Sequence, residues 1–98
     1  MSDELDHRRI VADGDHRWTR LDDEIIFLHE DKGVYFSLNG VAIRAWELLQ
    51  RPRTVDELVQ ILTREYDVTS EVCRRDLLRC LRELIDHGFV KYPDGATG

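Results

Sequence analysis

The stretch from Gly33 to Leu49 constrains the fold most, because its hydrophobic period changes in the middle. In residues 34–38 aromatic or aliphatic side chains alternate in the period of two that is typical of a β-strand. From Val41 onward the apolar residues recur at the spacing of one helix face. Asn39 lies between the two patterns, and its short polar side chain favours an N-cap. We therefore expect sheet before this junction and helix after it.

Two further strands are expected upstream, at residues 18–21 and 24–29. The pair Asp22-Asp23 between them is typical of a tight turn. The second strand is almost continuously apolar, which predicts a central place in a small sheet that is covered on both faces. Loops this short favour an antiparallel meander. The strand at residues 34–38 should then lie at an edge of the sheet.

Three helices are expected after the junction. The first covers residues 41–50 and should end before Pro52, because a residue that precedes proline disfavours helical backbone. The second begins at Thr54, which forms a capping box with the glutamate three positions later. Its apolar face is expected to include Tyr66.

The third helix should be capped by Thr69 or Ser70 and should run to His87. Gly88 then supplies a left-handed C-terminal cap, after which Phe89 can fold back on the helix. Its apolar residues are Cys73, Leu77, Leu78, Cys80, Leu81, Leu84 and Ile85. They spread over about 160° of the helix surface, against the stripe of ~100° that a single core contact needs. Either one margin of this helix faces a ligand, or the helix is central in a small bundle.

The size of the chain is that of one domain, since 98 residues can build a single modest core. We expect a flexible N-terminal segment at residues 1–15, with room for a short strand at 9–12. The folded domain then covers 16–92, where residues 90–92 can add a short strand, and a flexible tail covers 93–98. No apolar run reaches the ~20 residues of a membrane span, and no signal-peptide pattern is present, so a cytoplasmic location is expected.

Catalytic or metal-binding patterns are missing from the sequence. The four histidines (His7, His16, His29 and His87) are scattered, and no pair of them has metal-ligand spacing. Cys73 and Cys80 are seven positions apart in one expected helix, which is about 10 Å and too far for a disulfide. No glycine-rich phosphate loop or nucleophile motif occurs. We therefore expect a protein that is not an enzyme and that has neither cofactor nor metal.

A small sheet followed by three helices, the last two in helix-turn-helix order, is the outline of an α+β winged helix-turn-helix domain. The segments that carry a family resemblance are Tyr35–Gly40, Ala45–Leu49, Thr54–Leu58, Tyr66–Val68 and Leu81–Val90. In order and spacing they resemble the PqqD-like family of RiPP precursor peptide recognition elements. The resemblance covers about residues 17–90. It is stronger to the free-standing lasso-peptide proteins than to the pyrroloquinoline quinone protein, because the Pro-Glu that tends to precede the strand there is absent.

This resemblance implies a non-catalytic peptide chaperone. Proteins of this family capture the leader segment of a ribosomally made precursor as an additional strand and present it to a maturation enzyme, such as a leader peptidase or a radical enzyme. The leader lies between the edge strand and the third helix. The corresponding residues here are Val34, Tyr35, Phe36, Ser37, Leu38, Cys73, Arg74, Asp76, Leu77, Cys80 and Leu81. Arg74 and Asp76 would act as polar guides at the rim. An edge strand beside an apolar groove suits such capture, because it offers unpaired backbone groups and side-chain pockets.

Two alternatives from other classes remain open. The arginines at 75, 79 and 82 could place the third helix in the major groove of DNA as a transcription regulator, although the net charge of −6 opposes phosphate binding. Alternatively, a second copy of the chain could occupy the exposed strand edge and form a dimer.

Overall fold

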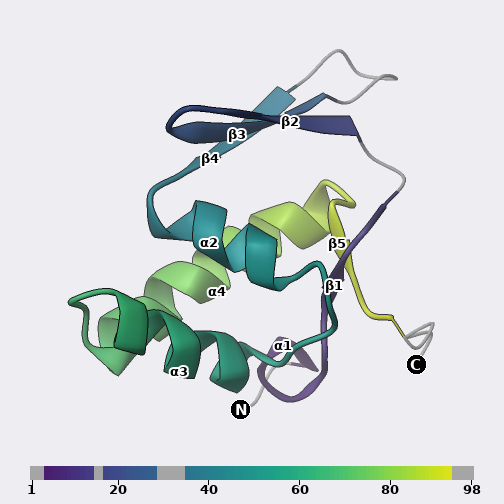
Figure 1. Cartoon of the computed structure of the whole chain (residues 1–98). Helices are drawn as coiled ribbons and strands as arrows, with labels where there is room; N and C mark the ends of the chain where they lie inside the picture. Colours follow the sequence, from purple (N-terminus) through teal and green to yellow (C-terminus); the bar gives the residue numbers. More distant parts are fainter. Residues whose placement is uncertain (1–3, 15–16, 29–34, 94–98) are drawn as a thin grey trace.

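A computed structural model gives the fold, and it describes residues 4–14, 17–28 and 35–93. The elements in chain order are α1 (Glu4–His7), β1 (Val11–Ala12), β2 (Arg17–Leu21), β3 (Glu24–Leu28), β4 (Tyr35–Asn39), α2 (Val41–Leu48), α3 (Val55–Glu65), α4 (Ser70–Asp86) and β5 (Val90–Lys91). The sheet of β2, β3 and β4 lies above the three longer helices (Figure 1). The expected α+β arrangement of a meander followed by three helices is confirmed.

The larger sheet has the order β2-β3-β4 and is antiparallel throughout, so β4 is an edge strand as predicted. Phe27 of β3 pairs with Phe36 of β4, and these side chains face the helices together with Ile25. Ile25 and Phe27 are fully buried, whereas Leu28 is 48% exposed. The prediction that β3 is covered on both faces is therefore wrong. The second face of the strand packs against no other described element, and its apolar run reflects β propensity more than burial.

Helix α2 joins the sheet to the helical layer through Trp46, which is 1% exposed. Its indole meets the ring of Phe27 edge to face at a centroid distance of 4.7 Å. The prediction that Asn39 caps this helix is wrong. Asn39 ends β4, and the N-cap is Gly40 at φ 58°, without a side-chain hydrogen bond. A positive φ is cheap for glycine, which lets the chain turn from strand to helix within one residue.

Helix α3 begins as predicted at a complete capping box between Thr54 and Glu57. Its buried residues are Val55, Leu58, Val59 and Leu62. Tyr66 does not extend this face, contrary to the expectation. It is the C-cap, has extended backbone (φ −126°, ψ 150°) and is 39% exposed, because the helix stops one residue earlier.

Helix α4 is capped by Thr69, whose hydroxyl accepts the backbone N–H of Val72. At its other end Gly88 has φ 81°, as predicted. The N–H of Gly88 donates to the carbonyl of Ile85, and the N–H of Phe89 donates to the carbonyl of Leu84. This pair of bonds is a Schellman motif, and it directs Phe89 into the core.

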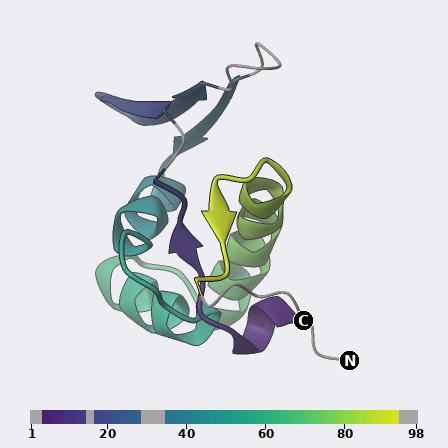
Figure 2. The ribbon, with the colours of Figure 1, turned by 90° about the vertical axis from the view of Figure 1, so that its right-hand side faces the viewer.

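The N-terminal segment differs from the expectation of a loose leader over residues 4–14. Leu5 of α1 is 2% exposed and Ile10 is fully buried. Strand β1 pairs antiparallel with β5, so the two short strands that were expected separately form one ribbon beside the helices (Figure 2). The anchors are hydrophobic contacts and long-range backbone pairs, which a polar local sequence does not reveal.

Candidate functional site: a groove between β4 and α4

A groove of about 250 Å³ separates the outer edge of β4 from α4. It is lined by Phe36, Ser37, Leu38 and Asn39 of the strand, Ala42 of α2, and Asp76, Arg79, Cys80 and Glu83 of α4. The four α4 residues have the spacing i, i+3, i+4 and i+7, so they form one helix face. We call this feature the strand–helix groove.

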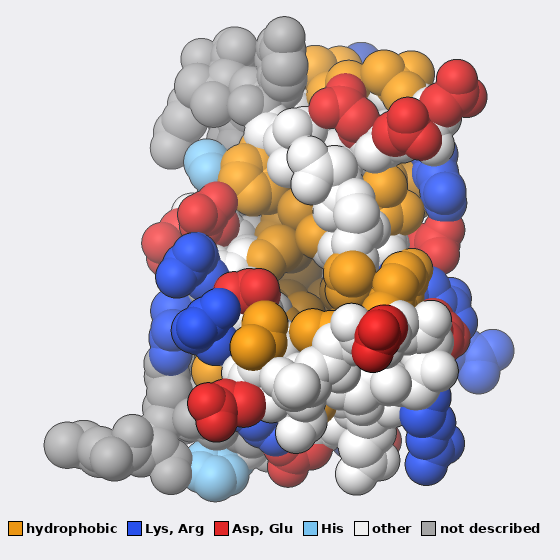
Figure 3. All heavy atoms as spheres, turned by 90° about the vertical axis from the view of Figure 1, so that its left-hand side faces the viewer, with side chains coloured by type: hydrophobic (Ala, Val, Ile, Leu, Met, Phe, Trp, Pro, Cys, Tyr) orange, Lys and Arg blue, Asp and Glu red, His pale blue; other side chains and the backbone are white. Residues whose placement is uncertain are grey.

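An apolar pocket continues this groove toward the start of α4. It has a volume of about 130 Å³ and is lined by Val41, Ala42, Leu62, Val68, Cys73, Asp76, Leu77 and Cys80. Ala42, Asp76 and Cys80 line both features, so the two are continuous. Hydrophobic side chains surround a hollow in the middle of this face of the molecule (Figure 3).

The strand register decides which backbone groups of β4 face away from the sheet. A two-residue turn joins Leu21 to Glu24, and the residues that flank such a turn form a hydrogen-bonded pair. Alternation then directs the backbone of Ile25 and Phe27 toward β4, where their partners are Leu38 and Phe36. The N–H and C=O of Ser37, between those two partners, therefore point outward from the sheet. An incoming strand could use both.

The strand residues expected at the site differ in how deeply they are buried. Phe36 is half-buried, with its ring 5.1 Å from that of His87 and 6.3 Å from that of Phe27, centroid to centroid. Ser37 is exposed, whereas Leu38 is only 3% exposed and belongs to the core as well as to the groove wall. Tyr35 contributes its backbone to β4. Val34 and the side chain of Tyr35 lie outside the described residues.

The expected α4 residues divide into those at the site and those away from it. Cys73 and Leu77 line the pocket, and Asp76 and Cys80 line both pocket and groove. Leu81 is fully buried and lines neither, because it points into the core between the helices. Arg74 also lines neither, since its guanidinium is paired with Asp56 of α3. The expectation that Arg74 guides a ligand at the rim therefore has no support in the geometry.

Several lining residues were not expected from the sequence. Arg79 and Glu83 border the groove, although neither was among the residues expected to bind a peptide. Val41 and Val68 border the pocket from the start of α2 and from the loop before α4. The helical spacing from Asp76 to Glu83 was a usable signal for the rim. No sequence signal indicated the two valines, because their position at the pocket depends on how α2 and α3 pack.

The two thiols at the site are poor nucleophiles. Burial raises the pKa of Cys80 to about 11, and the nearby Glu83 carboxylate adds to this effect. Burial likewise raises the pKa of Cys73. Both therefore remain protonated at neutral pH. The groove thus offers backbone hydrogen bonds, apolar surface and two rim charges, which suit binding an extended chain.

The described residues lack two further kinds of feature, a metal-binding cluster and a membrane-spanning helix. Residues 4–14, 17–28 and 35–93 contain no group of three or more His, Cys, Asp or Glu side chains that could hold a metal ion. Within the same ranges, no helix combines the length and the hydrophobicity that crossing a bilayer requires.

Comparisons with known proteins were made for both sequence and structure. The family model described as coenzyme PQQ synthesis protein D (PqqD) matches residues 24–90. A search of curated protein sequences finds no match. Among solved structures, TbiB1 in complex with the TbiA(beta) leader peptide is similar to this chain, with a TM-score of 0.71 and 31% sequence identity. The match covers 83% of this chain and 94% of TbiB1. Because the family model spans more than half of the sequence, from the start of β3 to β5, the chain belongs to the PqqD family.

Proposed function

We propose that this protein binds the leader segment of a ribosomally made precursor peptide and presents it to a separate maturation enzyme. The observation that carries the proposal is the outer edge of β4, which pairs with no other strand among the described residues and lies along a groove that ends in an apolar pocket. The similarity to TbiB1, whose structure contains a leader peptide, supports the same function. The resemblance to lasso-peptide proteins favours a lasso-type pathway, which would place the protein in the cytoplasm.

Binding would proceed by strand addition. The leader would pair antiparallel with β4, where the N–H and C=O of Ser37 would each gain a partner on the leader. Each such bond contributes about 0.5–1.5 kcal/mol net, independently of the leader's side chains. Alternate side chains of the leader would face α4, where Cys80 and Leu77 offer apolar contact. Backbone pairing would thus supply affinity and the pocket would supply selectivity.

The proposed role is non-catalytic, with the chemistry left to the maturation enzyme. The protonated thiols of Cys73 and Cys80 suit a binding surface better than a covalent step. The DNA-binding alternative gains no support, because Arg79 faces the groove and Arg75 contacts the carboxylate of Asp76. We therefore retain the peptide-binding function alone.

Calorimetry with synthetic leader segments tests this function. The segments should come from short reading frames beside the gene, and random duplex DNA at low salt serves as the comparison. One leader is expected to bind with a stoichiometry of one, and the masses of both molecules should stay unchanged after prolonged incubation. Cleavage or modification of the leader by the purified protein alone would contradict the proposal. Salt-sensitive binding of DNA without any leader binding would contradict it as well.

The rim charges should select the charges of the leader. Arg79 and Glu83 have no ion-pair partner within the described ranges, although both border the groove. Arg79→Glu should weaken binding of a leader variant with an acidic residue beside position 79 and strengthen binding of the matching lysine variant. Each change should be about 5-fold, as expected for partly exposed charge pairs. Arg64→Glu on α3, which borders neither groove nor pocket, is the matched control. Equal effects of the two substitutions on both leader variants would argue against a role for the rim.

Alkylation of Cys80 should report occupancy of the groove. A pKa of about 11 instead of the ordinary 9.0 lowers the thiolate fraction at neutral pH by about 100-fold, so reaction with iodoacetamide should be slow. A bound leader should slow it further, because Cys80 lines both groove and pocket. Mass spectrometry of the Cys73→Ala variant isolates this thiol. Unchanged alkylation in a saturated complex would mean that the leader lies elsewhere.

A further inference from the structure

A second, polar cleft lies beside the junction of β4 and α2. It has a volume of about 470 Å³ and is formed by β2, the turn after β2, the β4–α2 junction, α2 and the end of α3. The lining residues are Arg20, Asp22, Asp23, Asn39, Gly40, Ile43, Arg44, Glu47 and Tyr66. All of them, and their neighbours in the chain, belong to the described ranges. We call this feature the polar cleft.

The polar cleft adjoins the strand–helix groove. Asn39 lines both features, and Gly40, which follows it in the chain, lines the cleft. Beyond the chain neighbours of Gly40, no heavy atom lies within 4 Å of the place that a Cβ would take. The junction therefore raises no side-chain barrier between groove and cleft at this point.

Antiparallel pairing decides which part of a bound leader would reach this point. Asn39 is opposite Glu24 and Ser37 is opposite Ile26, so the backbone of Asn39 points outward from the sheet as that of Ser37 does. In an antiparallel partner, the residue beside Asn39 precedes the residue beside Ser37. The N-terminal flank of the leader would therefore leave β4 at Asn39, next to the polar cleft.

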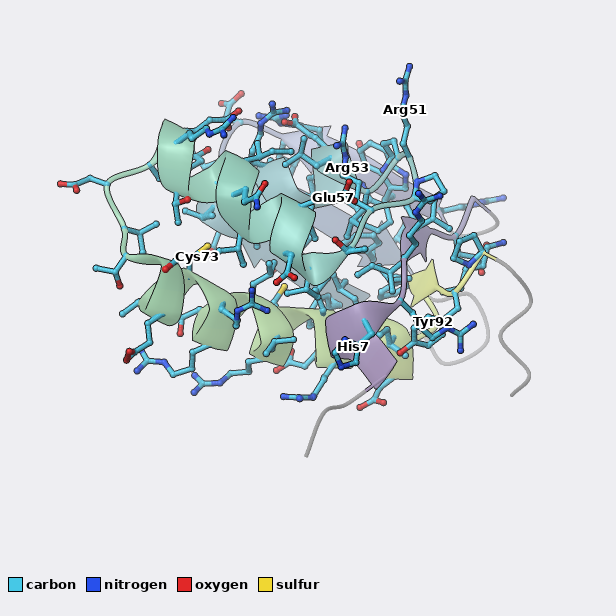
Figure 4. All side chains as sticks on the ribbon, turned by 90° about the horizontal axis from the view of Figure 1, so that it is seen from below. His7, Arg51, Arg53, Glu57, Cys73 and Tyr92 are labelled. Atoms are coloured by element: carbon cyan, nitrogen blue, oxygen red, sulfur yellow. The ribbon has the colours of Figure 1, made fainter. Side chains whose placement is uncertain are left out.

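The apolar pocket offers that flank no onward path. Its volume of about 130 Å³ is small beside the 470 Å³ of the polar cleft. Leu62 of α3 lines the pocket and is fully buried, and Figure 4 shows the side chain of Cys73 between α4 and α3. Because the pocket ends against α3, it can receive a side chain of the leader, whereas the backbone of the flank has open space at Gly40.

Ion pairs engage the arginines of the polar cleft and leave two of its carboxylates available. Arg20 pairs with a glutamate of α2, and Arg44 pairs with a glutamate of α3 at 2.8 Å. Within residues 4–14, 17–28 and 35–93, no cation pairs with Asp22 or Asp23, and both are exposed. Acidic side chains gather at the upper right of the face that contains the hollow (Figure 3). The available charge of the cleft is therefore negative.

Tyr66 adds an aromatic ring to this cleft. It is the C-cap of α3, has extended backbone and is 39% exposed. A cation over an exposed aromatic face gains about 0.5–1 kcal/mol. Carboxylates together with an aromatic ring suit a lysine or arginine side chain better than an acidic or an apolar one.

We propose that the polar cleft binds basic residues of the leader, immediately upstream of the segment that pairs with β4. This inference rests on the proposed function. Two features of the cleft determine the occupant: its continuity with the groove at Asn39, and the charge of Asp22 and Asp23. The cleft would thus select leaders with a basic N-terminal flank, whereas the groove and the pocket read the segment that follows.

Calorimetry with leaders that differ only in this flank tests the inference. The shortest leader segment that still shifts the Ser37 amide in NMR spectra is extended at its N-terminus by two lysines, two glutamates or two serines, and is then acetylated. The lysine extension should bind about 5-fold more tightly than the serine extension at low salt. This difference should shrink as salt is added. The glutamate extension should bind more weakly than the serine extension.

Removal of the two carboxylates should cancel this preference. In the variant that combines Asp22→Asn with Asp23→Asn, the lysine and serine extensions should bind within about 2-fold of each other. Asparagine keeps the shape of the side chain and is favoured in tight turns, so the fold should persist. Asp86→Asn is the matched control, because Asp86 is an exposed residue at the end of α4 that lines neither cleft nor groove. This control should keep the 5-fold preference.

Separate outcomes distinguish other occupants. A blocked tetralysine peptide, without any leader, should shift the amides of residues 20–23, 39–40 and 66, and shifts spread evenly over the surface would overturn the inference. Calcium chloride that shifts the same amides at lower concentration would overturn it in favour of a metal site. Tetralysine binding at the cleft without any preference among the three leaders would overturn it in favour of a basic segment of another protein. Equal binding of the three extensions leaves the proposed function intact, because that function fails only if no leader binds.

Discussion

Ser37→Pro should abolish most leader binding while the fold persists. The register directs the N–H of Ser37 outward, so proline at this edge position removes no bond within the sheet. It removes a donor to the leader and leaves a leader carbonyl unpaired, which costs about 1–3 kcal/mol, or roughly 5- to 150-fold in Kd. Calorimetry measures the affinity, and far-UV circular dichroism measures the fold. Ser37→Ala, which keeps the N–H, should bind within about 2-fold of the parent.

Proline at the two neighbouring positions, 36 and 38, should disrupt the fold itself. The backbone of Phe36 and Leu38 points toward β3, so Phe36→Pro or Leu38→Pro breaks a bond inside the sheet. Leu38 is also 3% exposed, and its loss opens the core. These variants should lose helical circular dichroism. If Ser37→Pro retains both fold and affinity, strand addition to β4 is the wrong mechanism.

Trp46→Ala should lower the free energy of unfolding by about 3–5 kcal/mol, out of the ~5–15 kcal/mol that a domain of this size has. The indole is 1% exposed and forms edge contacts with the rings of Phe27 and Trp18, at centroid distances of 4.7 and 5.7 Å. It is the main link between α2 and the sheet that carries β4. Urea denaturation should show a large fall in the midpoint, or no folded state at all. A midpoint that barely moves would mean that the contact does not hold the sheet.

Two variants separate the causes of this loss. The Nε1 of Trp46 has no hydrogen-bond acceptor among the described residues, and a buried donor without a partner is costly. Trp46→Phe removes that donor together with part of the ring, so it should cost much less than the alanine variant. Trp18 is 41% exposed, and Trp18→Ala should cost about 1 kcal/mol, mainly through the lost edge contact with Trp46.

Local signals in the sequence predicted several elements correctly. The capping box at Thr54 and the left-handed Gly88 depend on hydrogen bonds within a few residues, so the sequence contains all the necessary partners. The strand periodicity and the short loops likewise predicted the meander and the edge position of β4. Predictions from the sequence were wrong where a contact between residues far apart in the chain decided the local structure. Leu5 and Ile10 lie in a polar stretch, and their burial depends on surfaces formed by later elements.

The sequence by itself determined the order of the meander and the three longer helices, the edge strand and the apolar stripe of α4 that borders the groove. Only the tertiary structure decided how that stripe is divided: Leu81 enters the core, Cys80 faces the groove, and Arg74 turns toward Asp56 of α3. The period of a helix tells which residues share a face, but the angle at which neighbouring helices and strands pack decides what that face meets. The bridge between Ile10 and Arg53 depends on the same physics, because it joins segments that are more than forty positions apart in the sequence.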